Sequence, residues 1–228
     1  MPFLILLSLL ALALFGPQLW VRSVLRRYDR REEPFPGTAA ELARHLLDRF
    51  GLQEVRVEAA EEGAGDHYDP LQRAVRLTPD KLDRRSLTAV VTAAHEVGHA
   101  IQHAGGYPPF RWRLRLVRLA QVSEKVGSFL FFAVPLLALA TRAPSSGLLL
   151  FLIALTTTGI GVLVQLVTLP VEWDASFGRA LPILEAGYLE PGQHPAARRI
   201  LRACALTYVA ASLAGLLNFW RWMQLARR

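Results

Sequence analysis

The stretch AAHEVGHAIQH, residues 93–103, contains two histidines whose spacing suits one metal ion. His95, Glu96 and His99 form the pattern H-E-x-x-H, and residues four apart share one face of a helix. Both imidazoles can therefore reach one Zn²⁺ ion, which in catalytic sites keeps a fourth position open for water. Glu96 lies about 100° around the helix from His95, so it would flank that water and accept its proton as catalytic base.

The alternative is that these residues form the polar stripe of an ordinary helix. A chance H-E-x-x-H is expected in on the order of 1% of sequences with these His and Glu frequencies. Burying two histidines and a glutamate without a partner would be costly, however. The rest of the helix is apolar, with Ala93, Ala94, Val97, Ala100 and Ile101. A metal site therefore explains the pattern better.

His103 continues the four-residue spacing, but we do not expect it to bind the same ion. Eight residues correspond to about 12 Å along a helix, which is too far for one ion with Zn–N bonds of about 2.0–2.1 Å. We interpret it as polar packing around the site. The longer pattern H-E-x-x-H-x-x-G-x-x-H also fails, because Gln102 and Gly105 stand where it needs Gly and His. The third ligand must come from elsewhere.

Acids and histidines are few after the motif, and they are the candidates for the third ligand: Glu124, Glu172, Asp174, Glu185, Glu190 and His194. Glu172 is favoured because it directly follows an apolar segment, in TLPVEWDAS. Asp174 is the rival ligand; otherwise we expect it to accept a hydrogen bond from a histidine N–H. The alternative for Glu172 is a solvated residue at a helix start, and His67 or His194 would then come next.

Composition and charge distribution indicate membrane segments beside a water-facing domain. The 228 residues are 52% hydrophobic. Residues 22–125 contain 18 of the 26 Lys and Arg and 15 of the 19 Asp and Glu, so the remainder is nearly uncharged. The net charge of +7 accompanies no nucleic-acid motif, and the single cysteine, Cys204, excludes an intrachain disulfide.

Apolar segments divide the chain into six parts. Residues 1–21 are predicted to be a transmembrane anchor; a cleaved signal peptide is the alternative, but a basic start and an A-x-A site are lacking. Residues 126–169 are predicted to form a transmembrane hairpin, whose first helix could begin upstream, and residues 203–220 a further transmembrane helix. The other parts are the domain with the motif helix, 22–125, a segment with the third ligand, 170–202, and a basic tail, 221–228.

Arginines set the predicted orientation. RSVLRRYDRR follows the first segment and no basic residue precedes it, so the positive-inside rule places residues 22–125 in the cytoplasm. A hairpin crosses the membrane twice, so residues 170–202 return to the same side, which brings Glu172 to the side of the motif. The tail RWMQLARR would then lie outside with three arginines, against the rule, and its side stays open.

Local signals in the water-facing domain predict an α+β arrangement. Thr38, with Glu41 three residues later, predicts a capped helix. LQEVRVEAA and QRAVRLTP predict strands, and GAGDHYDP a turn; a functional role for DHYDP competes evenly with a plain turn. Ser86 is the predicted N-cap of the motif helix, which Gly105 ends.

Four motifs, DHYDP, AAHEVGHAIQH, QLVTLPVEWDAS and LTYVAAS, together resemble those of the YugP-type membrane zinc metallopeptidases. This family is in turn similar to the HtpX-like membrane proteases. The resemblance implies a gluzincin-like site in which His95, His99 and Glu172 bind zinc and Glu96 is the catalytic base. Many gluzincins have an Asp four residues after the third ligand. Here that position is Ser176, and the aspartate, Asp174, stands two residues after Glu172 instead.

The expected fold is thus a mostly α membrane protein with about four transmembrane helices and a cytoplasmic gluzincin-like α+β metalloprotease domain. We expect a multi-pass protein of the cell membrane that hydrolyses peptide bonds of membrane or membrane-proximal proteins with Zn²⁺; the resemblance itself does not supply the biological substrate. The expected partners are a protein or peptide substrate and the bilayer, without nucleic acid, and the sequence does not indicate an oligomeric state. Candidates for stabilising the oxyanion are Tyr68, His67 and His194.

Two other classes of protein stay open. In an intramembrane-cleaving protease the motif would lie in a membrane helix, but the apolar run before His95 covers only about eight residues of the roughly 20 needed. A catalytically silent zinc-containing scaffold or chaperone is the other class, and the intact Glu96 argues against it.

Overall fold

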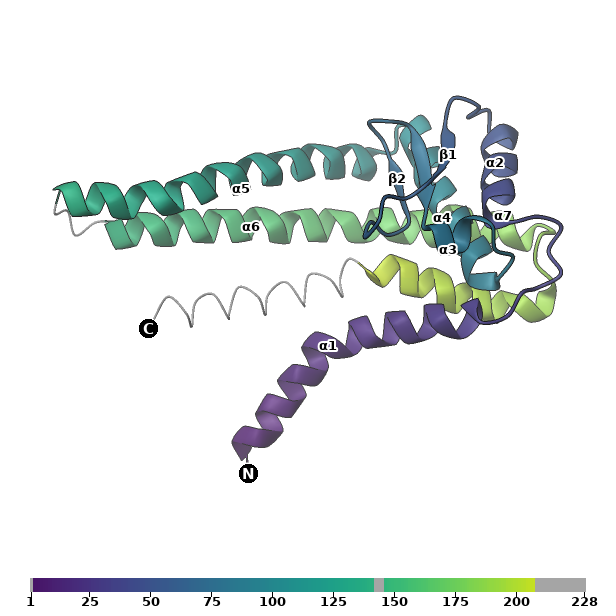
Figure 1. Cartoon of the computed structure of the whole chain (residues 1–228), viewed down its shortest axis with the longest axis horizontal. Coiled ribbons are helices and arrows are strands. Elements are labelled where there is room, and N and C mark those ends of the chain that lie inside the picture. The colour runs from purple at the N-terminus through teal and green to yellow at the C-terminus, as the bar shows by residue number, and fades with distance from the viewer. Residues whose placement is uncertain (1, 142–145, 208–228) are drawn as a thin grey trace. The chain divides into compact units, whose positions relative to one another are not determined.

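The computed structural model describes residues 2–141 and 146–207, which form two compact units. One unit combines the residues up to Tyr107 with those from Leu169 onward, and the other is Pro108–Thr168. The described residues are mostly helical with one small sheet, which confirms that part of the predicted fold (Figure 1). Most of the predicted membrane helix 203–220 and the whole basic tail 221–228 lie outside the described residues.

The sheet has three short strands in the order β1-β3-β2: β1 Arg56–Ala59, β3 Ala74–Leu77 and β2 His67–Asp69. β1 runs parallel to β3, and β2 antiparallel. β1 and β3 confirm the predicted strands, but β2 lies inside GAGDHYDP, so the prediction of a plain turn there is wrong. The physical reason is that Tyr68 is buried in the core, which holds this segment against β3. The tight turn comes after it, where the Asp69 carboxylate accepts hydrogen bonds from the N–H groups of Leu71 and Gln72.

Two helices of this unit begin at the predicted caps. α2, Ala39–Arg49, starts with a capping box, in which the Thr38 side chain and Glu41 bond each other's backbone N–H groups. The short α3 is Pro79–Leu82. α4, Leu87–Ala104, has Ser86 as N-cap and Gly105 as C-cap. Local hydrogen-bonding chemistry therefore fixes where the motif helix begins.

α4 is the central element of its unit. Fifteen of its 18 residues are buried, and α1, α2, β2, β3 and the segment after α6 pack around it. α1, Pro2–Asp29, is tied to the start of α4, because Thr88 Oγ1 donates to the Leu25 carbonyl and Ser86 Oγ to the Asp29 carboxylate. The histidine motif is therefore held inside a core with little freedom to move.

The second unit contains α5, Pro108–Thr141, and the first part of α6, Ser146–Trp173. α5 begins well upstream of its apolar part, as the sequence suggested. The two helices run side by side (Figure 1), and a methyl group on Gly127 would lie 3.0 Å from Thr157 Oγ1. Large apolar side chains on both helices face outward.

The chain after α6 continues in helical form within the first unit. A π-helical stretch η1, Asp174–Ala180, leads into α7, Leu181–Glu185, and a 3₁₀ turn η2, Pro191–Gln193, precedes a helix over 194–207. Among the described residues, one helical run, Gly159–Glu185, is long and apolar enough to cross a membrane by length and composition. The prediction of about four transmembrane helices therefore stays a prediction.

Candidate metal centre

Three buried side chains converge between α4 and the end of α6. His95 Nε2 lies 3.2 Å and His99 Nε2 3.3 Å from one oxygen, Oε2, of Glu172. One ligand atom from each residue can be chosen so that all lie within 4.8 Å of one another. The three side chains are 4%, 6% and 1% exposed, respectively. The structure thus brings together the three residues that the sequence singled out as zinc ligands.

The spacing of these atoms fits a zinc ion. Zn–N and Zn–O bonds are about 2.0–2.2 Å, so two ligand atoms at tetrahedral angles lie about 3.3 Å apart. The His95 and His99 nitrogens match that separation from Glu172. Two imidazole nitrogens and a carboxylate oxygen are also a donor set that Zn²⁺ prefers.

The other nitrogen of His95 is fixed by Ser176. Its Nδ1 lies 3.0 Å from Ser176 Oγ, and this hydroxyl donates its hydrogen to the Leu201 carbonyl at 3.1 Å. A hydroxyl has one hydrogen to give, so Ser176 must accept from His95 Nδ1–H. The lone pair of a neutral His95 ring is therefore on Nε2, facing Glu172.

The other nitrogen of His99 is fixed by Gln102 in the same way. His99 Nδ1 lies 3.0 Å from Gln102 Oε1, while Gln102 Nε2 donates to the Val171 carbonyl and to Asp174 Oδ2, both at 2.8 Å. Because the last two partners only accept, the orientation of the amide is determined. Gln102 Oε1 must accept from Nδ1–H, and the Nε2 lone pair of a neutral His99 also faces Glu172.

These tautomers favour a cation in the centre. Two imidazole lone pairs and a carboxylate oxygen meet in a buried space, and positive charge between them relieves their mutual repulsion. Protons on both rings would put two cationic imidazoles side by side, with ring centroids 4.8 Å apart. One metal cation between the three groups avoids that repulsion.

Asp174 lies one step further from the centre than the sequence suggested. It accepts hydrogen bonds from Gln102 Nε2 and from Arg179 Nε, each at 2.8 Å, and neither of these two bonds involves a histidine. The offset of two residues from Glu172 explains this, since two residues turn a helix by about 200° and send the side chains in different directions. Among the described contacts, Ser176 and Gln102 take the role expected of Asp174.

Gly98, inside the motif, allows the two halves of the centre to meet. A methyl group built on Gly98 would lie 2.7 Å from the carbonyl oxygen of Ala175 in η1. Any larger residue would therefore push η1 away from α4, and Glu172 and Ser176 with it. The π-helical geometry of η1 widens the helix at this point, a feature that is frequent at functional sites.

Glu96 is buried beside the two histidines in α4. The side chains considered for the oxyanion each have a hydrogen-bond or ion-pair partner outside the three converging residues. Tyr68 Oη lies 2.9 Å from His103 Nδ1, and burial raises the pKa of Tyr68 to about 12 and lowers that of His103. His67 bonds the Gly65 carbonyl.

The remaining sequence candidates have contacts of their own outside the centre. His194 Nδ1 lies 3.7 Å from a carboxylate oxygen of Glu185. In DHYDP, Asp66 accepts from the backbone and side chain of Thr78 and pairs with Lys81, which anchors the start of α3. The two aspartates of that motif therefore organise the β2–β3 region.

Comparison with known proteins agrees with this geometry. Residues 3–227 match the profile of the family described as "Putative neutral zinc metallopeptidase". The chain is also 36% identical over 222 residues to "Putative membrane protease YugP" of Bacillus subtilis (strain 168). The aligned part covers 97% of this chain and 95% of the relative. No solved structure matches the chain. Zinc is thus the cofactor indicated both by the family and by a residue group that could hold a metal ion, and the chain belongs to the neutral zinc metallopeptidase family.

Proposed function

We propose that the chain is a membrane-embedded zinc metalloendopeptidase in which His95, His99 and Glu172 bind the metal. The observation that carries this proposal is the pair of fixed histidine tautomers, whose Nε2 atoms face one carboxylate oxygen in a buried site. A purely structural cluster would be more stable with each lone pair facing a hydrogen-bond donor. The family and the relative's name support peptide-bond hydrolysis.

Glu96 is proposed as the catalytic base. Bound zinc lowers the pKa of a coordinated water toward about 7 and polarises a carbonyl group. The Glu96 carboxylate, next to His95 in the same helical turn, takes the proton of the attacking water and passes it to the leaving amine. His95 and His99 are kept in position by Ser176 and Gln102, so the ligands need not reorganise during the reaction.

Substrates are proposed to be membrane or membrane-proximal proteins. The outward-facing apolar side chains of α5 and α6 and the long apolar run Gly159–Glu185 favour attachment to a bilayer. A peptide bond must come close to Glu172, which lies inside that run. Cleavage sites near a membrane surface would meet the centre most readily.

The proposed topology has four membrane segments, with the domain 22–125 and the segment 170–202 in the cytoplasm. Labelling with a membrane-impermeant thiol reagent tests it. Cys204 is first replaced by alanine, and single cysteines are then introduced at positions 145 and 192. The hairpin requires the two positions to react from opposite sides of the membrane. If both positions reacted from the same side, the predicted transmembrane hairpin would be wrong.

Activity is tested with purified protein and a casein-like substrate, with and without a chelator. The protein is expected to carry about one zinc per chain, which a double variant, His95→Ala with His99→Ala, should lose. Glu96→Gln keeps the size of the side chain but cannot accept a proton, so it should retain zinc and lose roughly 10²–10⁴-fold in turnover. Wild-type protein that binds zinc without cleaving anything would point instead to a silent scaffold.

A further inference from the structure

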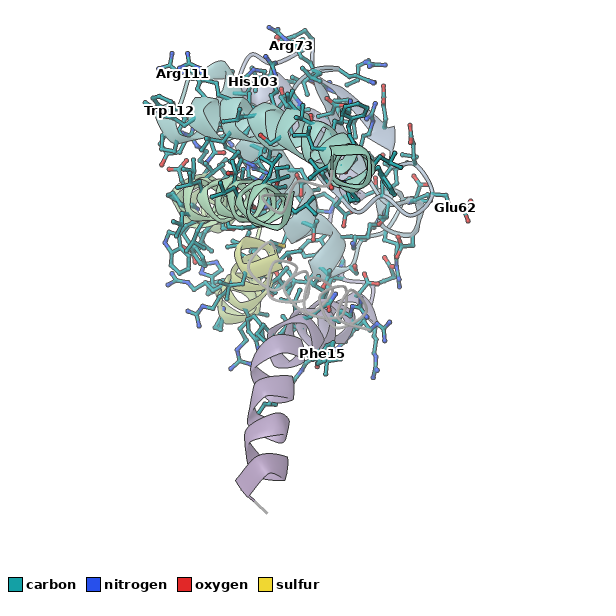
Figure 2. The ribbon with its side chains drawn as sticks, turned by 90° about the vertical axis from the view of Figure 1, so that its left-hand side faces the viewer. Phe15, Glu62, Arg73, His103, Arg111 and Trp112 are labelled. Carbon is teal, nitrogen blue, oxygen red and sulfur yellow. The ribbon has the colours of Figure 1, made fainter. Side chains whose placement is uncertain are left out.

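One face of α1 changes from apolar to basic along its length. Successive residues of a helix are 100° apart, so residues spaced three, four and seven apart cluster on one side. Five residues of α1, and Arg30 directly after its last residue, fall within an arc of about 80° when the helical rotation is continued by one residue: Leu12, Phe15, Leu19, Arg22, Arg26 and Arg30. All six side chains are exposed, and Phe15 is labelled in Figure 2. The helix therefore presents an apolar stripe that runs directly into an arginine stripe.

The opposite face of α1 is occupied by packing. Val21 is buried together with Ala203, and Val24 and Leu25 pack against this pair. Arg199 Nη1 donates to Tyr28 Oη at 3.5 Å, on the same side. These contacts with the helix over 194–207 fix the rotation of α1. The stripe is consequently held outward.

The charges of the arginine stripe are not neutralised within the described part of the chain. No ion pair there involves Arg22, Arg26 or Arg30, while the neighbouring acids Asp29 and Glu32 are both paired with Arg84. With Leu19, Ser23 and Arg27, the three arginines line a hollow of about 600 Å³. Four arginines thus line one surface hollow at the C-terminal end of α1.

We propose that this face binds an anionic phospholipid, with its phosphate on the arginine stripe and its acyl chains along Leu12, Phe15 and Leu19. Guanidinium groups bind phosphate through paired N–H donors. The order of apolar and basic residues along the helix matches the order of tail and headgroup in the lipid. A zwitterionic lipid offers the same tails, but its ammonium group would meet uncompensated arginines. The inference rests on the membrane attachment proposed above and not on the zinc chemistry.

Lipid binding to the full-length purified protein tests the proposal, for example by counting retained lipids in native mass spectrometry. The probes are phosphatidylglycerol and phosphatidylcholine, and wild type should prefer the former. The stripe variant carries Gln at positions 22, 26 and 30. It should bind phosphatidylglycerol on the order of 100-fold more weakly, from roughly five-fold per arginine near a membrane surface. A matched control with Arg49→Gln, Arg56→Gln and Arg73→Gln removes the same charge from other exposed sites and should bind normally.

A second variant separates charge from folding. Lysine at the three stripe positions keeps the positive charge, so it should retain binding within about ten-fold of wild type. Zinc content and thermal midpoint are measured on every variant, so a failure of the zinc site is distinguishable from a failure of this proposal.

Four results would overturn the lipid site. One is an equal loss of binding in the matched control. Another is phosphatidylcholine binding as tightly as phosphatidylglycerol. Inorganic phosphate binding as tightly as the lipid would reveal a small-anion site. Finally, a single-stranded oligonucleotide that binds more tightly than the lipid, and loses binding in the stripe variant, would identify a nucleic-acid surface.

Discussion

α4 and the helices of the second unit are both rich in apolar residues, yet they use them in opposite ways. α4 is buried on nearly all sides, and its polar residues His95, His99 and Gln102 bond one another or partners from η1 and the end of α6. Phe129 on α5, in contrast, is 71% exposed, and Leu166 on α6 is 65% exposed. One region is stabilised by burying side chains within the protein, whereas the other exposes apolar side chains that residues 2–141 and 146–207 leave uncovered.

The comparison predicts that catalysis and metal affinity depend on α4 and on the residues packed against it at the end of α6 and in η1, and not on the second unit. The largest effect is expected from Glu172→Ala, which removes one of three ligands and should empty the site of zinc. Asp174→Ala should weaken zinc binding by only roughly 10–100-fold, because Asp174 acts through Gln102. Zinc analysis of both purified variants checks this. An empty site in Asp174→Ala with a full one in Glu172→Ala would mean that the two acids have the opposite roles.

The next effect concerns the partners of the histidine rings. Ser176→Ala and Gln102→Met each remove the acceptor of one Nδ1–H, which frees the ring to rotate and leaves a buried donor unpaired. Each should lower zinc affinity by roughly 10–100-fold, as measured by competition with a chromophoric chelator. Ser123→Ala in α5 is the matched control and should change nothing. Unaltered affinity in both site variants would show that the rings are positioned in some other way.

A smaller effect is expected from the contact between α4 and η1. Gly98→Ala places a methyl group 2.7 Å from the Ala175 carbonyl, and crowding of this kind typically costs about 1–3 kcal/mol. The thermal midpoint should fall. Gly161→Ala in α6 is the control, because its methyl group meets no atom within 4 Å and alanine is the better helix former. If the thermal midpoint fell equally in both variants, the close approach of η1 to Gly98 would not explain the effect.

The smallest effect on zinc is expected from the second unit. A double variant, Phe129→Ser with Leu166→Ser, changes two exposed apolar side chains of the second unit. Zinc affinity should stay within experimental error, while the fraction of protein recovered in membranes should decrease. Loss of zinc in this variant would contradict the prediction that metal binding does not depend on the second unit.

The elements that the sequence predicted well are those with local signals. Thr38 and Ser86 cap α2 and α4 because their hydroxyl groups bond the first backbone N–H groups, and such chemistry is visible in a short stretch. The approach of Glu172 to the histidines was predicted from ligand chemistry and from counting membrane crossings. The structure brings these residues together; their roles as ligands, like that of Glu96 as base, stay predictions.

The parts that the sequence did not predict depend on tertiary contacts. β2 forms because the buried side chain of Tyr68 holds this segment against β3. No periodicity in GAGDHYDP indicates that burial. The roles of Ser176 and Gln102 follow from which helix faces meet. One signal was present, since Ser176 stands where many gluzincins have an acid, but only the close packing of η1 on α4 shows that its hydroxyl is the acceptor for His95.

The assembly of the centre from distant segments has a consequence for biosynthesis. Glu172 follows His95 by 77 residues. At about 5–20 residues per second, a ribosome needs roughly 4–15 s to cover that distance. Throughout this interval the nascent chain carries the H-E-x-x-H motif without the acid and without the hydroxyl of Ser176. With the proposed ligand set, the zinc site is complete only after both α5 and α6 have been synthesised. The nascent chain therefore cannot hydrolyse nearby proteins before that point.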